Sequence, residues 1–176
     1  IQNTSNLLNT TATAPYVIVV KKNAATLKNL NLKLDEIRIN EDNEIVDRPM
    51  LLIDELVNIK KLKSATAIVN VKKDSFFVQG HFPGQPVMPG VLIVEAFGQA
   101  AAALTAAGID KSTYENKLVF LMTVDKARFR SPVIPDCKLE LNIEAVRSHG
   151  RVWKYQGEAF VDGKKKADAQ WAATIV

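Results

Sequence analysis

One segment, residues 91–107, constrains the fold more than any other part of the sequence. It contains no proline, a single glycine (Gly98) and many alanines, and it therefore predicts one helix roughly 25 Å long. Its residues are apolar on nearly every helical face, and Glu95 is its one charged residue. A helix of this kind has to be surrounded by protein and cannot lie on a surface.

Three later stretches alternate between apolar and polar residues with a period of two, which is typical of strands with one buried face. His149-Gly150 separates the first two stretches, and Asp162-Gly163 between the last two is a strong hairpin signal. The sequence therefore predicts an antiparallel meander. Its apolar positions are Leu139, Leu141, Ile143 and Ala145, then Trp153, Tyr155, Gly157, Ala159 and Val161, then Ala167, Ala169, Trp171, Ala173 and Ile175.

The part before the helix is less regular. Residues 51–59 and 64–71 predict two strands around a turn at Lys60-Lys61, and residues 16–20 predict a short strand. Residues 27–37 form an apolar-patterned segment of undetermined type. We expect residues 1–46 to be an N-terminal extension of unassigned role, which could add to an oligomer surface, and residues 47–176 to be one domain.

Strands on both sides of one buried helix predict the α+β class, with an antiparallel sheet wrapped around the helix. The composition is that of an ordinary globular protein, with 47% hydrophobic residues and a net charge of +4. This charge is far below what a nucleic-acid-binding surface needs. The single Cys137 cannot form an internal disulfide, and we expect no membrane-spanning helix.

The residues suited to chemistry are concentrated in one run, Gly80-His-Phe-Pro-Gly-Gln-Pro-Val-Met-Pro-Gly-Val-Leu-Ile-Val-Glu-Ala-Phe-Gly-Gln-Ala, which ends at Ala100. Glu95 lies in mid-helix among apolar residues, where an ionised carboxylate is costly without a partner. These surroundings favour the protonated carboxyl, which suits a general acid. The alternative is a structural glutamate whose hydrogen bonds are satisfied.

His81 lies in the proline- and glycine-rich loop before the helix, and a histidine can accept a proton near neutral pH. We therefore predict that it is the base, whereas His149, in a predicted turn, fits a structural role. Gly90 opens the helix, where free N–H groups can bind an oxyanion, or where a glycine simply permits a tight turn. Gln99 lies one turn after Glu95 and either orients it or packs in the core.

This run resembles the signature of the (3R)-hydroxyacyl-[acyl-carrier-protein] dehydratases of the Z type, which have the hot-dog fold. A second segment, residues 124–136, is similar to the strand that follows the helix in that family. The resemblance covers residues 47–176. The chain departs from the family pattern in its N-terminal extension, in the abbreviated segment at 47–49, and at Asp136-Cys137, where a Gly-Asp pair is usual.

The resemblance implies dehydration of a (3R)-hydroxyacyl thioester to a trans-2-enoyl thioester, with His81 as base, Glu95 as acid and the Gly90 N–H at the thioester oxygen. It implies no cofactor and no metal. In the proteins that this sequence resembles, the histidine and the glutamate come from opposite subunits of a homodimer. A monomer would then be inactive, and the dimers often assemble into a hexamer, as a trimer of dimers.

The implied partner is an acidic acyl carrier protein, whose phosphopantetheine arm delivers the substrate. Lys126, Arg128 and Arg130 alternate along one strand and could dock the carrier, or they could form an ordinary solvated face. Candidates to line an acyl tunnel, each of which could equally belong to the core, are Phe82, Val87, Met88 and Phe97.

We expect a cytoplasmic protein, or one in an organelle stroma if a targeting segment has been removed, with no nucleic acid or membrane partner. One alternative is another hot-dog thioester enzyme. A thioesterase does not carry this loop and glutamate, and an isomerising dehydratase resembles this chain with aspartate at the position of Glu95. The other alternative is a carrier-protein-binding scaffold whose site is unused.

Overall fold

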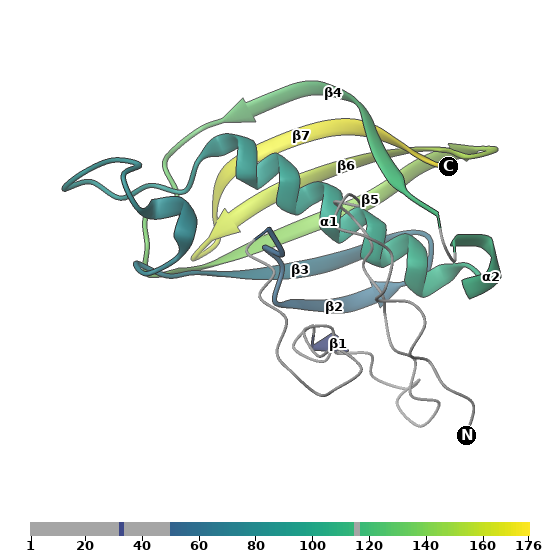
Figure 1. The fold of residues 1–176 in the computed structure, drawn as a ribbon, viewed down its shortest axis with the longest axis horizontal. Coiled ribbons are helices and arrows are strands. Elements are labelled where there is room, and N and C mark those ends of the chain that lie inside the picture. Colours follow the sequence, from purple (N-terminus) through teal and green to yellow (C-terminus); the bar gives the residue numbers. More distant parts are fainter. Residues whose placement is uncertain (1–31, 34–49, 115–116) are drawn as a thin grey trace.

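The computed structural model describes residues 32–33, 50–114 and 117–176 (Figure 1). The expected strand at 16–20 and most of the apolar segment at 27–37 lie outside these ranges. The helices are α1 (Gly90–Gly108) and the short α2 (Lys111–Tyr114), preceded by one 3-10 turn, η4 (Phe76–Val78). The strands are β1 (Leu32–Lys33), β2 (Glu55–Lys60), β3 (Ser64–Val71), β4 (Val119–Phe129), β5 (Cys137–His149), β6 (Val152–Val161) and β7 (Lys164–Ile175).

All the strands belong to one antiparallel sheet with the order β1-β2-β3-β5-β6-β7-β4. Strands β5, β6 and β7 form the predicted meander, and Asp162 and Gly163 make the turn between the last two, both with positive φ. The chain leaves β3, forms α1, returns along β4 at one edge of the sheet, and then enters β5 beside β3 (Figure 1). Among the described strands, β4 therefore has one neighbour, β7.

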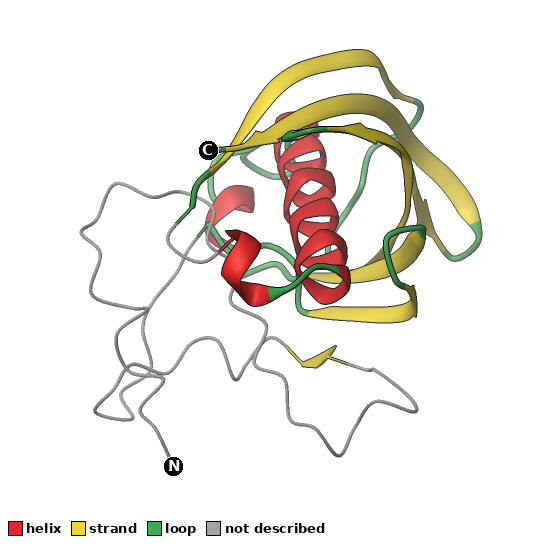
Figure 2. Ribbon diagram, turned by 90° about the vertical axis from the view of Figure 1, so that its right-hand side faces the viewer, coloured by secondary structure: helices red, strands yellow, loops and turns green. Residues whose placement is uncertain are grey.

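The sheet curves around α1, as Figure 2 shows, and this confirms the expected arrangement. The side chains of Phe97 and Leu104 are fully buried. The predicted inward positions of the three late strands are buried or half-buried throughout. Within the described ranges, α1 is the one helix long and apolar enough to cross a membrane, and 61% of the window concerned is buried inside the protein. This is the burial expected of a core helix.

Stacked aromatic rings join the helix to the meander. The ring of Phe97 stacks on Trp171 with centroids 5.2 Å apart, and Trp171 stacks on Tyr155 at 5.8 Å. A Cβ atom at Gly157 would lie 2.7 Å from the ring of Phe97, so only glycine fits there. Burial raises the pKa of Tyr155 to about 12, and its hydroxyl shares a hydrogen bond with Thr105.

The helix is one residue longer at each end than predicted, whereas the first strand of the domain starts at Glu55 and not at residue 51. Residues 51–54 are nevertheless partly or fully buried, and Leu52 and Ile53 belong to the core. The reason is that the N–H of Leu52 donates to the side chain of Gln99 on α1, at 2.9 Å, and not to a neighbouring strand. Apolar patterning could not distinguish this buried coil from a strand.

Candidate active site

His81 lies in the loop between η4 and α1, and two hydrogen bonds join it to Val87. The N–H of Val87 donates to the carbonyl oxygen of His81 at 2.7 Å, and the Nδ1 atom of His81 lies 2.9 Å from the carbonyl oxygen of Val87. Because a carbonyl oxygen can only accept, Nδ1 carries the proton. The Nε2 atom of the neutral ring then has a free lone pair, as a general base requires.

The loop holds the imidazole on a second side as well. The ring of Phe82 stacks on that of His81 with centroids 4.2 Å apart, and the side chain of Phe82 is 58% exposed. The N–H of Met88 donates to the carbonyl oxygen of Val133 at 2.9 Å, which ties the loop to the segment that follows β4. These contacts hold His81 in place, and the residue remains half-buried.

Glu95 lies in the second turn of α1 and is half-buried. Its Oε1 atom accepts a hydrogen bond from Nε2 of Gln99 at 2.7 Å. Gln99 is 4% exposed, and its Nε2 also donates to the carbonyl oxygen of Met50 at 2.6 Å. The contact between Gln99 and Glu95 expected from their spacing is therefore present, and Gln99 also belongs to the buried core.

Gly90 is the first residue of α1, so its N–H has no intrahelical acceptor. The N–H groups of Leu92 and Ile93 both donate to the carbonyl oxygen of Pro89. The ring of Phe129 in β4 packs against this first turn, and a Cβ atom at Gly90 would lie 3.0 Å from its nearest carbon. The free N–H at a helix start that was considered from the sequence is present, and the close approach of Phe129 is an additional feature that the sequence did not predict.

His81 thus lies in the loop that leads into α1, and Gln99 contacts Glu95 on that helix. No hydrogen bond joins His81 to Glu95 in the described part of the chain. The expected tunnel residues separate into two groups. Met88 and Phe97 are buried in the core at 2% and 0% exposure, whereas Phe82 is exposed and Val87 half-buried beside His81.

Strand β4 carries an unusual set of exposed apolar side chains. Ten of its eleven residues are exposed, although most of the strand pairs with β7. The exposed apolar side chains in its first half are Phe120, Leu121, Met122 and Val124, each between 42% and 52% exposed. A long edge strand with apolar residues pointing to both sides is a surface that readily pairs with another chain.

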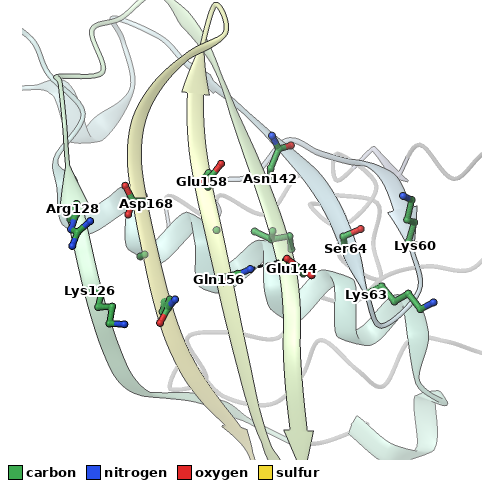
Figure 3. A pocket seen from close by; sticks show the side chains of 14 residues that line it. Lys60, Lys63, Ser64, Lys126, Arg128, Asn142, Glu144, Gln156, Glu158 and Asp168 are labelled. Atoms are coloured by element: carbon green, nitrogen blue, oxygen red, sulfur yellow. Dashed lines mark hydrogen bonds between the residues drawn. The ribbon is translucent and has the colours of Figure 1, made fainter.

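The expected docking residues lie at the same edge of the sheet, on its outer face. Lys126 and Arg128 line a depression of about 780 Å³ that runs across this face to Lys60 and Lys63, with acidic and amide side chains between (Figure 3). Arg130 differs from these two, because its guanidinium binds Asp168 at 2.7 Å. Lys126 and Arg128 therefore remain as the better candidates to meet an acidic partner.

Two contacts at the site had no signal in the sequence. The packing of Phe129 against Gly90 depends on how β4 crosses the helix, and the bonds from Gln99 to the main chain of residues 50–52 depend on a buried coil. There was no sequence signal either for the contact between Asp136 and Lys73, in which the backbone N–H and the ammonium group of Lys73 lower the pKa of the Asp136 carboxyl.

Among the described residues, no group of three His, Cys, Asp or Glu side chains could hold a metal ion.

Comparison with known proteins gives consistent matches over this region. Residues 45–170 match the family model of the FabA-like domain. A protein of Myxococcus xanthus named "3-hydroxyacyl-[acyl-carrier-protein] dehydratase FabZ" is 49% identical over 130 residues, which cover 73% of this chain and 83% of that protein. Proteins with the same name from Anaeromyxobacter sp. (strain K) and Gluconobacter oxydans are 45% and 47% identical, covering 72% and 73% of this chain and 81% and 75% of their own lengths.

Solved structures agree on the fold. One is titled "The Dehydratase Heterocomplex ApeI:P from Xenorhabdus doucetiae" and matches with a TM-score of 0.61 at 17% identity, over 73% of this chain and 84% of that one. Another, Cj0977, a virulence protein of Campylobacter jejuni, matches with a TM-score of 0.56 at 16% identity, over 74% and 80% of the two chains. The sheet, its central helix and the match over residues 45–170 together show that the chain has the hot-dog fold and belongs to the FabA-like family.

Proposed function

We propose that this chain is a 3-hydroxyacyl-[acyl-carrier-protein] dehydratase of fatty acid synthesis, which converts a (3R)-hydroxyacyl thioester into the trans-2-enoyl thioester and water. The observation that carries the proposal is the identity of 44–49% to relatives of that name over nearly three quarters of the chain. The geometry of the His81 loop supports it, because it leaves one ring nitrogen free to accept a proton.

The reaction assigns one task to each residue. The Gly90 N–H donates to the thioester oxygen, where negative charge develops as the C2 proton leaves. The Nε2 atom of His81 takes that proton, and the electron pair of the C–H bond becomes the new double bond between C2 and C3. Glu95 protonates the departing C3 hydroxyl, which leaves as water. Both residues return to their starting states when the histidine proton passes back to the glutamate through solvent.

We further propose that the active unit is a homodimer built along β4. The exposed apolar side chains of this edge strand would pair with those of a second copy, and the two sheets would become continuous. Because no hydrogen bond joins His81 to Glu95 within the described part of one chain, we propose that each site takes its histidine from one subunit and its glutamate from the other. Three such dimers forming a hexamer is part of the same proposal.

The substrate would arrive on an acyl carrier protein. This partner is acidic, and the side chains of Lys126 and Arg128 face outward beside the dimer edge, where they could meet its surface or the phosphate of its arm (Figure 3). A carrier-linked substrate is a soluble one, so we propose a cytoplasmic or organelle-stromal enzyme.

The test is turnover of a (3R)-hydroxyacyl carrier-protein thioester, followed by enoyl absorbance and by mass. We expect wild type to form the enoyl thioester, and His81→Ala and Glu95→Gln each to lower kcat by ~10²–10⁴-fold. His149→Ala and Glu140→Gln are matched controls, since both residues are exposed on β5, and they should keep full activity.

Each alternative outcome would indicate a different function for this protein. Release of free acid by wild type would replace the dehydratase with a thioesterase. A wild-type protein that binds the carrier but leaves the substrate unchanged would be a scaffold. Formation of a cis-3-enoyl product would identify an isomerising dehydratase.

A further inference from the structure

The hydrogen bonds of Gln99 fix which way its amide faces. Its Oε1 atom accepts from the N–H of Leu52 at 2.9 Å, and its Nε2 atom donates to the carbonyl oxygen of Met50 at 2.6 Å. Both main-chain groups have a single possible role, because an N–H only donates and a carbonyl oxygen only accepts. Turning the amide over would bring like groups together at both contacts, in a site where Gln99 is 4% exposed.

The locked amide determines the role of the contact with Glu95. The second N–H of Nε2 is directed to Oε1 of Glu95, 2.7 Å away, so Oε1 has to accept. In a protonated carboxyl group the carbonyl oxygen is the better acceptor, and the proton is on the other oxygen. The proton of an acidic Glu95 is therefore on Oε2, the oxygen that Gln99 does not bind.

We propose that Gln99 is a positioning residue that keeps the acid proton of Glu95 on Oε2 and stabilises the carboxylate once that proton has left. The bond from Nε2 to Oε1 becomes charge-assisted at that moment, and such bonds are roughly twice as strong as neutral ones. The main chain of residues 50–52 fixes the orientation of the Gln99 amide through its two hydrogen bonds. The inference rests on the proposed function, in which Glu95 is the general acid.

Gln99→Glu is the sharpest variant, because it has nearly the same shape. The new side chain, when ionised, could still accept from the Leu52 N–H, but it has no proton for the Met50 carbonyl or for Glu95, and it brings a second negative charge to Oε1. Once protonated, the same side chain can donate again. We therefore expect kcat of this variant to rise by about tenfold or more as the pH is lowered from 8 to 6, a range in which the wild-type profile is flatter.

Gln99→Met tests the same idea without a new charge, since methionine fills a similar volume and has no N–H. We expect kcat to fall by about tenfold or more, with KM within about twofold of wild type. Thr105→Val is the matched control. Thr105 is a second buried polar residue of α1, 5% exposed, and its bonds go to Ala101 and Tyr155 and not to Glu95. It should lower the melting temperature and leave kcat unchanged.

Circular dichroism and sizing establish that each variant is folded before kinetics are compared. The inference is overturned if Gln99→Met keeps kcat within twofold of wild type, or if the pH profile of Gln99→Glu follows that of wild type. Either result would make Gln99 a core residue only. Failure of the proposed function is recognised separately, because wild type itself would then form no enoyl thioester.

Discussion

The ring of Phe129 lies directly over Gly90, so that a Cβ atom added to the glycine would stand 3.0 Å from the nearest ring carbon. Gly90→Ala must therefore push the ring away. Because Phe129 is 53% exposed, the ring has solvent to move into, and we expect the melting temperature to fall by only a few degrees. We expect a larger effect on turnover, a loss of about tenfold or more, because the donor at the helix start shifts.

Gly98→Ala is the matched control for this substitution. It adds the same methyl group to the same helix, but nothing lies within 4 Å of its Cβ position. A helix-interior glycine is less stable than alanine by ~0.5–1 kcal/mol, so this variant should be slightly stabilised and fully active. If Gly90→Ala and Gly98→Ala turn over the substrate at the same rate, the N–H at Gly90 takes no part in the reaction.

The edge strand predicts an oligomer that a single charge can disrupt. Leu121→Lys places an ammonium group among the exposed apolar side chains of β4, where pairing with a second copy would bury it. We expect the variant to elute at a smaller size in light-scattering chromatography and to lose activity in parallel. Val146→Lys carries the same change on β5, at a side chain 54% exposed, and should alter neither property. A variant of unchanged size would place the dimer elsewhere.

Charge reversal tests the docking surface. Lys126→Glu together with Arg128→Glu should raise KM for the carrier-linked substrate by about tenfold, with kcat little changed, because surface charges act mainly on encounter. The difference from wild type should shrink as salt is added. Arg151→Glu together with Lys164→Glu, both exposed beside the turns that precede β6 and β7, changes the net charge by the same amount and is the control. If this control raises KM equally, Lys126 and Arg128 have no special role in docking.

The buried hydroxyl of Tyr155 makes stability depend on pH in the alkaline range. Its pKa is raised from 10 to about 12 in the folded protein, so the folded state holds the proton more tightly than the unfolded state. This contribution is complete below pH 10 and is lost as the pH rises towards 12. It amounts to about 2–3 kcal/mol.

Urea unfolding of wild type and Tyr155→Phe at pH 9 and at pH 11.5 measures this effect. The variant lacks the hydrogen bond to Thr105 and should be less stable by ~1 kcal/mol at pH 9. The gap should close or reverse at pH 11.5. Parallel losses in both proteins would assign the alkaline instability to other groups.

The central helix and the late strands could be predicted because their periodicity is set by local burial. Residues 91–107 are apolar all round, and the meander alternates strictly, so few other folds were compatible with them. The predicted start of the first strand of the domain was wrong by four residues, since the N–H of the buried Leu52 bonds to the side chain of Gln99 and not to a neighbouring strand. Contacts of this kind join residues far apart in sequence and leave no periodic signal.

In the candidate site, too, local sequence patterns could be interpreted, whereas contacts between distant residues could not. His81 and Glu95 were predicted from a specific loop and from one charge in an apolar helix, and their roles stay predictions. The tautomer of His81 and the facing of Gln99 depend on carbonyl groups whose directions only the folded backbone determines. The burial of Phe97 against Trp171 likewise depends on how the sheet curves, and residue type could not separate a tunnel wall from the core.

The place of α1 in the chain order affects how this protein is made. Ser64 of β3 pairs with Glu144 of β5, so the sheet cannot close until the helix and the edge strand have both been synthesised. At about 5–20 residues per second, Gly108 is added to the growing chain roughly 3–13 s before Ile175. During that interval the most apolar segment of the chain has little of its cover, and newly made protein has to be kept from aggregating until the last strands arrive.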